Sequence, residues 1–135
     1  MFTTKHLGSC LFLAVALAIG FALVAPAEEH TKDSLATVKE TLGTKKAVLI
    51  DVREKQEWDR GHLRDAKLLP LSGLKDESKV LQMVLPKDKA VYVHCRSGVR
   101  CLQAAEILRK QGYDARALKE GYQDLLQAGF PKAEK

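Results

Sequence analysis

The sequence of 135 residues lacks the patterns that several common kinds of functional site require. It has no glycine-rich nucleotide loop and no apparent Ser/His/Asp triad. Aromatic residues are few and basic residues are dispersed, which argues against a nucleic-acid partner. Of its three cysteines, Cys95 and Cys101 have a spacing that is unusual for zinc, and no second pair of ligands follows. We therefore expect no metal site and no other cofactor.

Charge is absent from a long stretch near the N-terminus. No charged residue occurs between His6 and Glu28, and this apolar run follows a basic start and ends in Ala-Pro-Ala. Such a pattern is typical of a secretory signal. We therefore expect residues 1–27 to be a signal peptide cut after Ala27, and the protein to be exported to the periplasm. The alternative is an uncleaved membrane anchor, since about 18 apolar residues begin to suffice to span a bilayer.

The remaining chain, residues 28–135, has the composition of an ordinary soluble domain. Residues 1–27 contain one lysine and no acidic residue, so cleavage lowers the net charge from +5 to +4. This mild excess of positive charge attracts small anions. The length is usual for one domain of about 100–150 residues. We expect a single domain and a monomer.

Helical and strand patterns alternate along this domain. Apolar and β-forming runs predict strands at 46–52, 66–71, 90–95 and 114–119. Helical spacing, caps and stop signals predict helices at 35–43, 54–61, 75–85, 99–112 and 121–129. The alternation predicts an α/β fold with a central parallel sheet flanked by helices on both faces. Ligands of such sheets bind beyond the C-terminal ends of the strands, and Cys95 is the last residue of a predicted central strand.

Cys95 lies where this strand turns into a helix, with Arg96 and Arg100 close behind it. A helix N-terminus favours an anion, and the two arginines add positive charge. Gly98 gives the backbone the freedom to curl its amides around one point. We therefore expect a reactive thiolate with a pKa of about 7 or below, although a free cysteine is often only a small buried hydrophobe. Because Arg100 opposes the dipole of the predicted helix, we expect a negative group beside it.

The neighbouring histidines and the second cysteine allow other interpretations. Successive strand residues face opposite ways, so His94 should point away from Cys95, and we interpret both His94 and His62 as packed or hydrogen-bonded side chains. Paired cysteines in an oxidising compartment usually form a structural disulfide. A link between Cys95 and Cys101 would close a very small loop and remove little unfolded-state entropy. Chemistry at Cys95 is therefore the favoured interpretation.

Two stretches, "HCRSGVR" at 94–100 and "VLIDVREKQEWDRGHLRDAKLLP" at 48–70, resemble the hallmarks of the rhodanese family of sulfurtransferase domains. The first is similar to the active-site loop of that family. The second is similar to its Asp-Val-Arg motif, followed by an acidic–aromatic pair, Gly-His-hydrophobe and a strand ending in proline. The resemblance covers roughly residues 34–131. Four residues of the scaffold depart from the family pattern. Asp65 stands where the family often has glycine, and Leu68 where it often has a polar residue. Tyr122 replaces a frequent second glycine, and Leu125 a frequent tryptophan.

The resemblance implies a double-displacement reaction. Cys95 would attack the outer sulfur of thiosulfate or another sulfane donor, sulfite would leave, and cyanide or a thiol would take the sulfur from a Cys95 persulfide. Backbone amides would hold the persulfide, and Arg96 and Arg100 would also hold the sulfonate of the donor. The implied substrate-binding residues are Arg96, Ser97, Gly98, Val99 and Arg100. Asp51 and Arg53 would support the scaffold as a partly buried ion pair.

Two other functions are compatible with these residues. Cysteine phosphatases and arsenate reductases have a similar loop, but with five residues between cysteine and arginine instead of the four between Cys95 and Arg100. A non-catalytic sulfur-carrier module is the other alternative, although inactive relatives often lack the cysteine. Cys101 is a possible redox partner that attacks the persulfide or forms an inactivating disulfide with Cys95. It is also well suited to be a small residue packed at a helix start.

Overall fold

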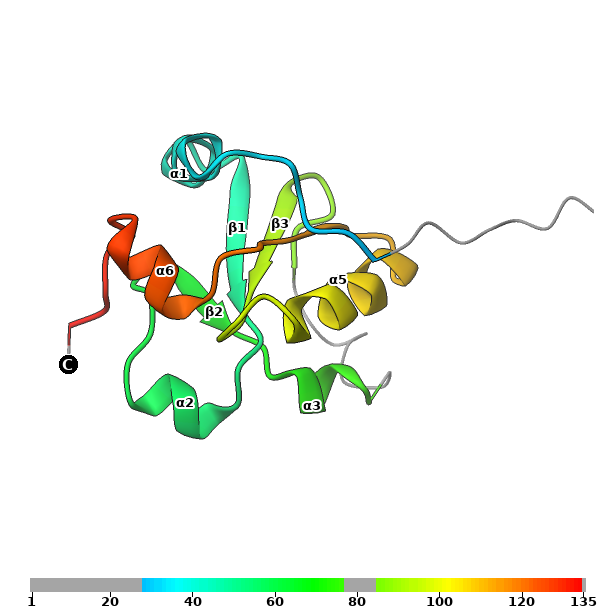
Figure 1. The fold of residues 1–135 in the computed structure, drawn as a ribbon. Helices are drawn as coiled ribbons and strands as arrows, with labels where there is room; N and C mark the ends of the chain where they lie inside the picture. The colour runs from blue at the N-terminus through cyan, green and yellow to red at the C-terminus, as the bar shows by residue number, and fades with distance from the viewer. Residues whose placement is uncertain (1–27, 77–84, 135) are drawn as a thin grey trace, which may run out of the picture.

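Four parallel strands form the centre of the domain in this computed structural model, which describes residues 28–76 and 85–134 (Figure 1). The strands lie in the order β2-β1-β3-β4. Their bounds are β1 Ala47–Asp51, β2 Ala66–Leu68, β3 Ala90–His94 and β4 Asp114–Ala117. The apolar run that predicts β1 is buried on both faces of the sheet, as expected for a central parallel strand.

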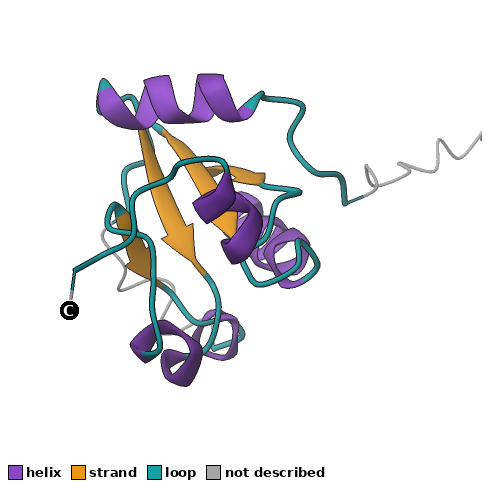
Figure 2. Cartoon of the chain, turned by 60° about the vertical axis from the view of Figure 1, so that its left-hand side comes forward, coloured by secondary structure: helices purple, strands orange, loops and turns teal. Residues whose placement is uncertain are grey.

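Helices cover both faces of the sheet (Figure 2). On one face, α3 (Leu71–Leu74) and α5 (Arg100–Lys110) pack over a cluster that includes Val91 and Val93. On the other, α1 (Leu35–Gly43) and α6 (Tyr122–Gln127) pack over a cluster that includes Tyr92. The alternation of these three β3 residues between two cores follows from the period of a strand. The predicted α/β fold with a parallel sheet is therefore confirmed.

The predicted helices and strands that lie within the described residues agree with the observed bounds to within two residues, except β2, which ends earlier. Cys95 was predicted to be the last residue of β3, but the strand ends at His94, so Cys95 is the first residue beyond it. β2 ends at Leu68, and β4 ends at Ala117, two residues before its predicted end. Pro70, which we expected only to stop a strand, instead precedes the short helix α3, because a proline at a helix start sacrifices no helical hydrogen bond.

The remaining described helix, α2 (Lys55–Asp59), lies in the connection between β1 and β2 and buries none of its residues. The predicted helix at 75–85 lies for the most part outside the described residues. The predicted signal peptide, 1–27, also lies outside them. Within 28–76 and 85–134, no helix has the length and apolar character that crossing a membrane requires.

A buried ion pair joins the end of β1 to the segments around it. Asp51 is fully buried and Arg53 is 4% exposed. Arg53 Nη2 lies 2.7 Å from Asp51 Oδ2 and donates a second hydrogen bond to the Gly61 carbonyl at 2.9 Å. The guanidinium carbon also lies 4.0 Å from the centre of the Tyr122 ring. The predicted ion pair is confirmed, and it is more deeply buried than expected.

Replacing Asp51 with alanine would leave the Arg53 guanidinium buried without its carboxylate. We expect the free energy of unfolding to fall by about 3–5 kcal/mol, the usual cost of removing one partner of a buried pair. Asp65→Ala is the matched control, because the Arg64–Asp65 side chains are 64% and 50% exposed and their pairing contributes under ~1 kcal/mol. Urea denaturation followed by circular dichroism measures both. Equal losses would contradict a special role for the buried pair.

Candidate active site

The loop from Cys95 to Val99 joins β3 to α5 at the C-terminal end of the sheet. Gly98 has a φ of 82°, in the region that favours glycine, and its N–H donates to Cys95 Sγ at 3.1 Å. A Cβ at Gly98 would collide with the carbonyl oxygen of Lys119. A glycine is therefore required here by its dihedral angle and by the close approach of a second backbone.

The segment before α6 holds the loop from the other side. The Tyr122 N–H donates to the Cys95 carbonyl at 2.9 Å. A Cβ at Gly121 would collide with the Arg96 carbonyl, so the two backbones pass each other at a distance that only glycine allows. These contacts fix both ends of the turn around Cys95 and leave its amides facing the sulfur.

Cys95 is fully buried, but polar groups surround its sulfur. A hydrogen bond from the Cys101 thiol lowers the pKa of Cys95 most, and the amides of Ser97, Cys101 and Gly98 lower it further, while burial acts in the opposite direction. The resulting pKa of Cys95 is about 5. The direction agrees with the sequence prediction, but its main cause does not, because we had assigned the shift to the helix N-terminus and to two arginines.

Cys101 is a buried thiol in the first turn of α5. Its S–H group lies 3.2 Å from the Leu118 carbonyl as a hydrogen-bond donor. The hydrogen bond to Cys95, and then burial, raise the pKa of Cys101, so this side chain keeps its proton. Both cysteines are free. The structural disulfide is therefore not formed in this structure, and Cys101 instead acts on the charge of its neighbour.

The two arginines of the loop have different surroundings. Arg100 forms two hydrogen bonds with the Glu57 carboxylate of α2, at 2.7 and 2.8 Å. This pairing lowers the pKa of Glu57 to about 2 and raises the pKa of Arg100. Glu57 is thus the negative group expected beside Arg100. Arg96 is exposed and has no ion pair within the described part of the chain.

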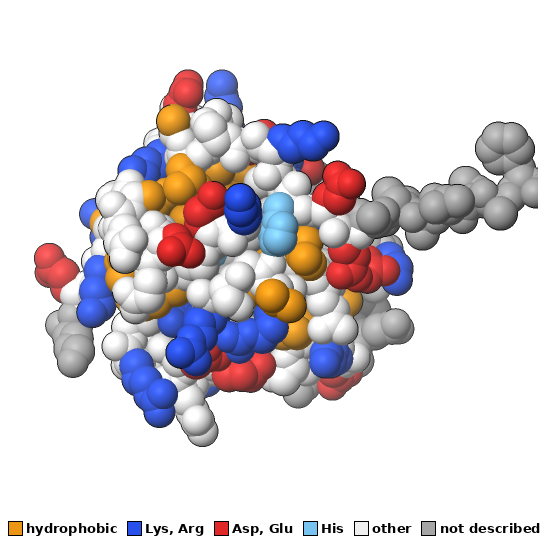
Figure 3. Space-filling view, viewed as in Figure 1, with side chains coloured by type: hydrophobic (Ala, Val, Ile, Leu, Met, Phe, Trp, Pro, Cys, Tyr) orange, Lys and Arg blue, Asp and Glu red, His pale blue; other side chains and the backbone are white. Residues whose placement is uncertain are grey.

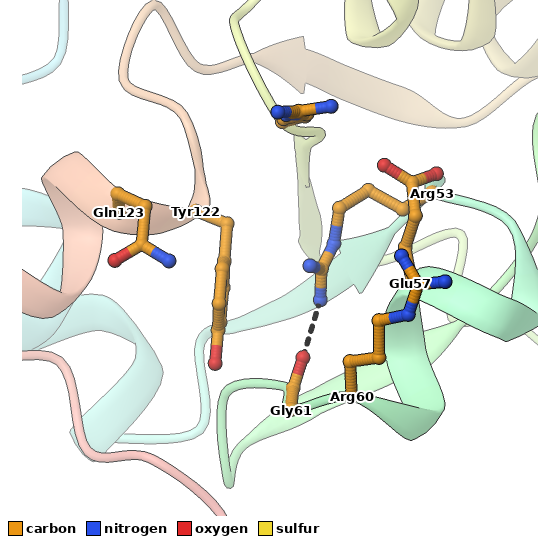
Figure 4. Close-up of a pocket in the computed structure, with 7 residues that line it drawn as sticks. Arg53, Glu57, Arg60, Gly61, Tyr122 and Gln123 are labelled. Carbon is orange, nitrogen blue, oxygen red and sulfur yellow. Dashed lines mark hydrogen bonds between the residues drawn. The ribbon is translucent and has the colours of Figure 1, made fainter.

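A pocket of about 270 Å³ opens beside the loop at Arg96. Figure 4 shows Arg53 and Tyr122 directed the same way along its wall, with the Arg53 hydrogen bond to Gly61 at its base. On the same face, basic side chains gather between α6 and α5 (Figure 3). The pocket is lined by Arg53, Glu57, Arg60, Gly61, Arg96, Tyr122 and Gln123. Its charge and size suit a small anionic ligand.

Sequence analysis missed several residues of this pocket. Tyr122 stood out only as a departure from a family glycine, and the structure places its side chain in the wall. Arg60 and Gln123 carried no signal in the sequence, because only the fold brings them beside Arg96. Among the predicted loop residues, Ser97 is exposed, and the Val99 side chain is 69% exposed and faces solvent.

The two histidines are structural, as predicted. His94 is fully buried, and its Nδ1 lies 3.4 Å from the Cys95 carbonyl. Burial lowers the pKa of His94, which keeps it neutral. His62 donates from Nδ1 to the Trp58 carbonyl at 3.1 Å and stacks on the Trp58 ring at 3.6 Å. Among residues 28–76 and 85–134, no three potential metal ligands lie together.

Replacing Cys101 with alanine removes the thiol that contributes most to the low pKa of Cys95. We expect the pH midpoint of Cys95 alkylation by iodoacetamide to move from about 5 to a higher pH, by up to about one unit for one lost hydrogen bond. Cys101→Ser is the matched control, because a hydroxyl also donates. Stopped-flow alkylation with peptide mapping measures the midpoint. An identical shift in both variants would contradict the assigned hydrogen bond.

Comparison with known proteins gives consistent matches. Residues 34–128 match the family described as "Rhodanese-like domain". The chain is 44% identical over 70 residues to an uncharacterized protein, YqhL, of Bacillus subtilis. The aligned segment covers 52% of each chain. It is 33% identical over 81 residues to a protein named sulfurtransferase from Allochromatium vinosum, covering 60% of this chain and 72% of that one. The chain therefore spans about half the length of the Bacillus relative.

Two solved structures are similar over most of their own length. One is a human single-domain sulfurtransferase, TSTD1, with 28% identity and a TM-score of 0.61 over 70% of this chain and 94% of that chain. The other is a rhodanese-related protein from Thermoplasma volcanium, with 28% identity and a TM-score of 0.61 over 74% and 94%. The family match covers more than half of the sequence. The predicted resemblance is confirmed, and the chain belongs to the rhodanese-like domain family.

Proposed function

We propose that this protein is a thiosulfate sulfurtransferase that carries sulfur as a persulfide on Cys95. Its family and its sulfurtransferase relatives support sulfur transfer in general. The observation that carries the finer proposal is the hydrogen bond of 3.1 Å from the Gly98 amide to Cys95 Sγ, in a loop where the pKa of Cys95 is about 5. A thiolate at neutral pH is the form of cysteine that attacks sulfur.

The reaction needs no external oxidant or reductant. The Cys95 thiolate attacks the outer sulfur of thiosulfate, the sulfur–sulfur bond of the donor breaks, and sulfite leaves with the electron pair. A Cys95 persulfide remains. Cyanide or a thiol then attacks the outer sulfur of the persulfide, and the Cys95 thiolate is regenerated as leaving group. The loop amides stabilise the negative charge in each step because they already point at the sulfur.

Access to the sulfur requires a small movement. Cys95 has no exposed surface in this structure, so the thiolate must turn from the Cys101 thiol toward the pocket at Arg96 before it meets the donor. The loop backbone can stay in place during this rotation, because the Tyr122 N–H holds the Cys95 carbonyl and not its side chain. We also propose that the reaction takes place after export, in keeping with the apolar run before Glu28.

Arg96 and Arg60 are the groups we assign to the sulfonate of the donor. Both line the pocket, and neither has an ion pair within residues 28–76 and 85–134. Arg100, which the resemblance also assigned to the donor, is already neutralised by Glu57. Its role in this proposal is to hold α2, and therefore Arg60, beside the loop.

The full-length protein should gain the mass of one sulfur atom after incubation with thiosulfate, and should lose it on addition of cyanide, with thiocyanate as product. Intact-mass spectrometry and a thiocyanate assay measure the two steps. Cys95→Ala should show neither, and thiocyanate formation by that variant at the wild-type rate would contradict the proposed nucleophile. Phosphate release from a phosphate ester without thiocyanate formation would instead identify a phosphatase. A stable persulfide without turnover would identify a sulfur carrier.

Removing either unpaired arginine should weaken donor binding. We expect Arg96→Ala and Arg60→Ala each to raise the KM for thiosulfate about tenfold or more with little change in kcat, since a hydrogen bond to a charged group contributes about 1.5–3 kcal/mol. Lys46→Ala is the control, because Lys46 is exposed at the opposite end of β1. Steady-state kinetics with cyanide as acceptor measure the effect. An unchanged KM in both arginine variants would remove them from the proposed anion site.

A further inference from the structure

The segment that precedes α1 contacts the Cys95 loop, although about 70 residues separate them. Figure 1 shows this blue segment leaving α1 and descending toward α5. His30 Nε2 lies 2.6 Å from the carbonyl oxygen of Gly98. A carbonyl oxygen can only accept, so the ring nitrogen must carry the hydrogen and donate it. His30 is therefore a hydrogen-bond donor to the loop in its neutral and its protonated form.

The segment that carries His30 is itself held in place. The Thr31 N–H donates to the Ala117 carbonyl of β4 at 2.8 Å. Asp33 Oδ2 accepts from the Tyr92 hydroxyl at 2.7 Å and from Arg116 Nη1 at 2.8 Å. Three contacts within four residues thus anchor the segment to the sheet, which places the imidazole over Gly98 without any help from the loop.

Gly98 is the residue through which this contact reaches the sulfur. Its N–H donates to Cys95 Sγ at 3.1 Å, while its carbonyl accepts from His30. The Lys119 carbonyl and the His30 ring both lie close to the position that a Cβ on Gly98 would occupy. With φ at 82°, Gly98 has more conformational freedom than any other residue type would have there. The amide and the carbonyl of Gly98 belong to successive peptide planes that are joined at its Cα, so a bond to the carbonyl opposes the rotations at this Cα that would turn the amide away.

We propose that His30 is a positioning residue, which holds the Gly98 carbonyl so that the amide of the same residue faces the Cys95 thiolate. Its effect on sulfur transfer rests on the function proposed above, but its effect on the Cys95 thiolate does not. The titratable or charged groups of the packed elements that interact electrostatically with Cys95 are His94 of β3 and Cys101 and Arg100 of α5. None of them replaces the contact from His30, because none bonds to the Gly98 carbonyl.

The test compares three variants of the full-length chain, His30→Ala, His30→Gln and Lys32→Ala. We expect His30→Ala to raise the pH midpoint of Cys95 alkylation by about half a unit and to slow alkylation at pH 5 about twofold, as one weakened hydrogen bond predicts. His30→Gln should restore the wild-type midpoint, because its amide can donate to the same carbonyl. Lys32→Ala should match the wild type, because Lys32 is exposed on the same segment.

Two results would overturn the proposal. One is a wild-type midpoint in His30→Ala, and the other is an equal shift in His30→Ala and His30→Gln, which would indicate lost packing instead of a lost donor. If His30→Ala does not fold, His30→Gln alone decides, since a shifted midpoint in a folded glutamine variant contradicts the role of the donor. Alkylation needs no thiosulfate. A protein that forms no persulfide but shows the His30 effect would thus refute the proposed function and leave this inference intact.

Discussion

The buried ion pair of Asp51 and Arg53 holds together the segments that surround the Cys95 loop. Arg53 follows β1, donates to the Gly61 carbonyl after α2 and lies against the Tyr122 ring of α6. A guanidinium buried to this degree is tolerated only when a carboxylate and further acceptors satisfy it. The positions of α2 and α6 are therefore linked to one side chain, and with them two walls of the pocket beside the loop.

The site separates two electrostatic tasks between different kinds of group. The charge on the Cys95 sulfur is stabilised at close range by the Cys101 thiol and by backbone amides, which have fixed positions and no charge of their own. Guanidinium groups instead face the pocket, where a free anion would arrive. Because Arg100 is neutralised by Glu57, little full positive charge lies next to the sulfur. Such an arrangement stabilises an anion that appears and disappears without a tightly bound counter-ion.

Local features of the sequence predicted the frame of this site well. The unbroken apolar run before Asp51 indicated a central parallel strand, and the abrupt change from strand to helix located the Cys95 turn. Predictions were weaker where distant segments meet. The negative partner of Arg100 was expected, but Glu57 could not be identified, because the two residues are 43 positions apart in sequence and only the fold brings them together.

Two further differences have local physical causes. Pro70 was interpreted only as the end of a strand, whereas a proline also suits the position before a helix. The low pKa of Cys95 was predicted from the helix N-terminus, the backbone amides and two arginines, whereas the Cys101 thiol, which contributes most, was not foreseen. The direction in which an S–H group or an amide points depends on dihedral angles, which cannot be read from a sequence.

The Cys101 thiol has a single hydrogen but two acceptors within reach, the Leu118 carbonyl and the Cys95 sulfur. It cannot donate fully to both, so its orientation must follow whichever acceptor is more negative at that moment. When the charge leaves Cys95, the hydrogen should swing toward Leu118. The S–H stretching vibration of this one group, in a region of the infrared spectrum that is free of other protein bands, would then change with the charge on Cys95.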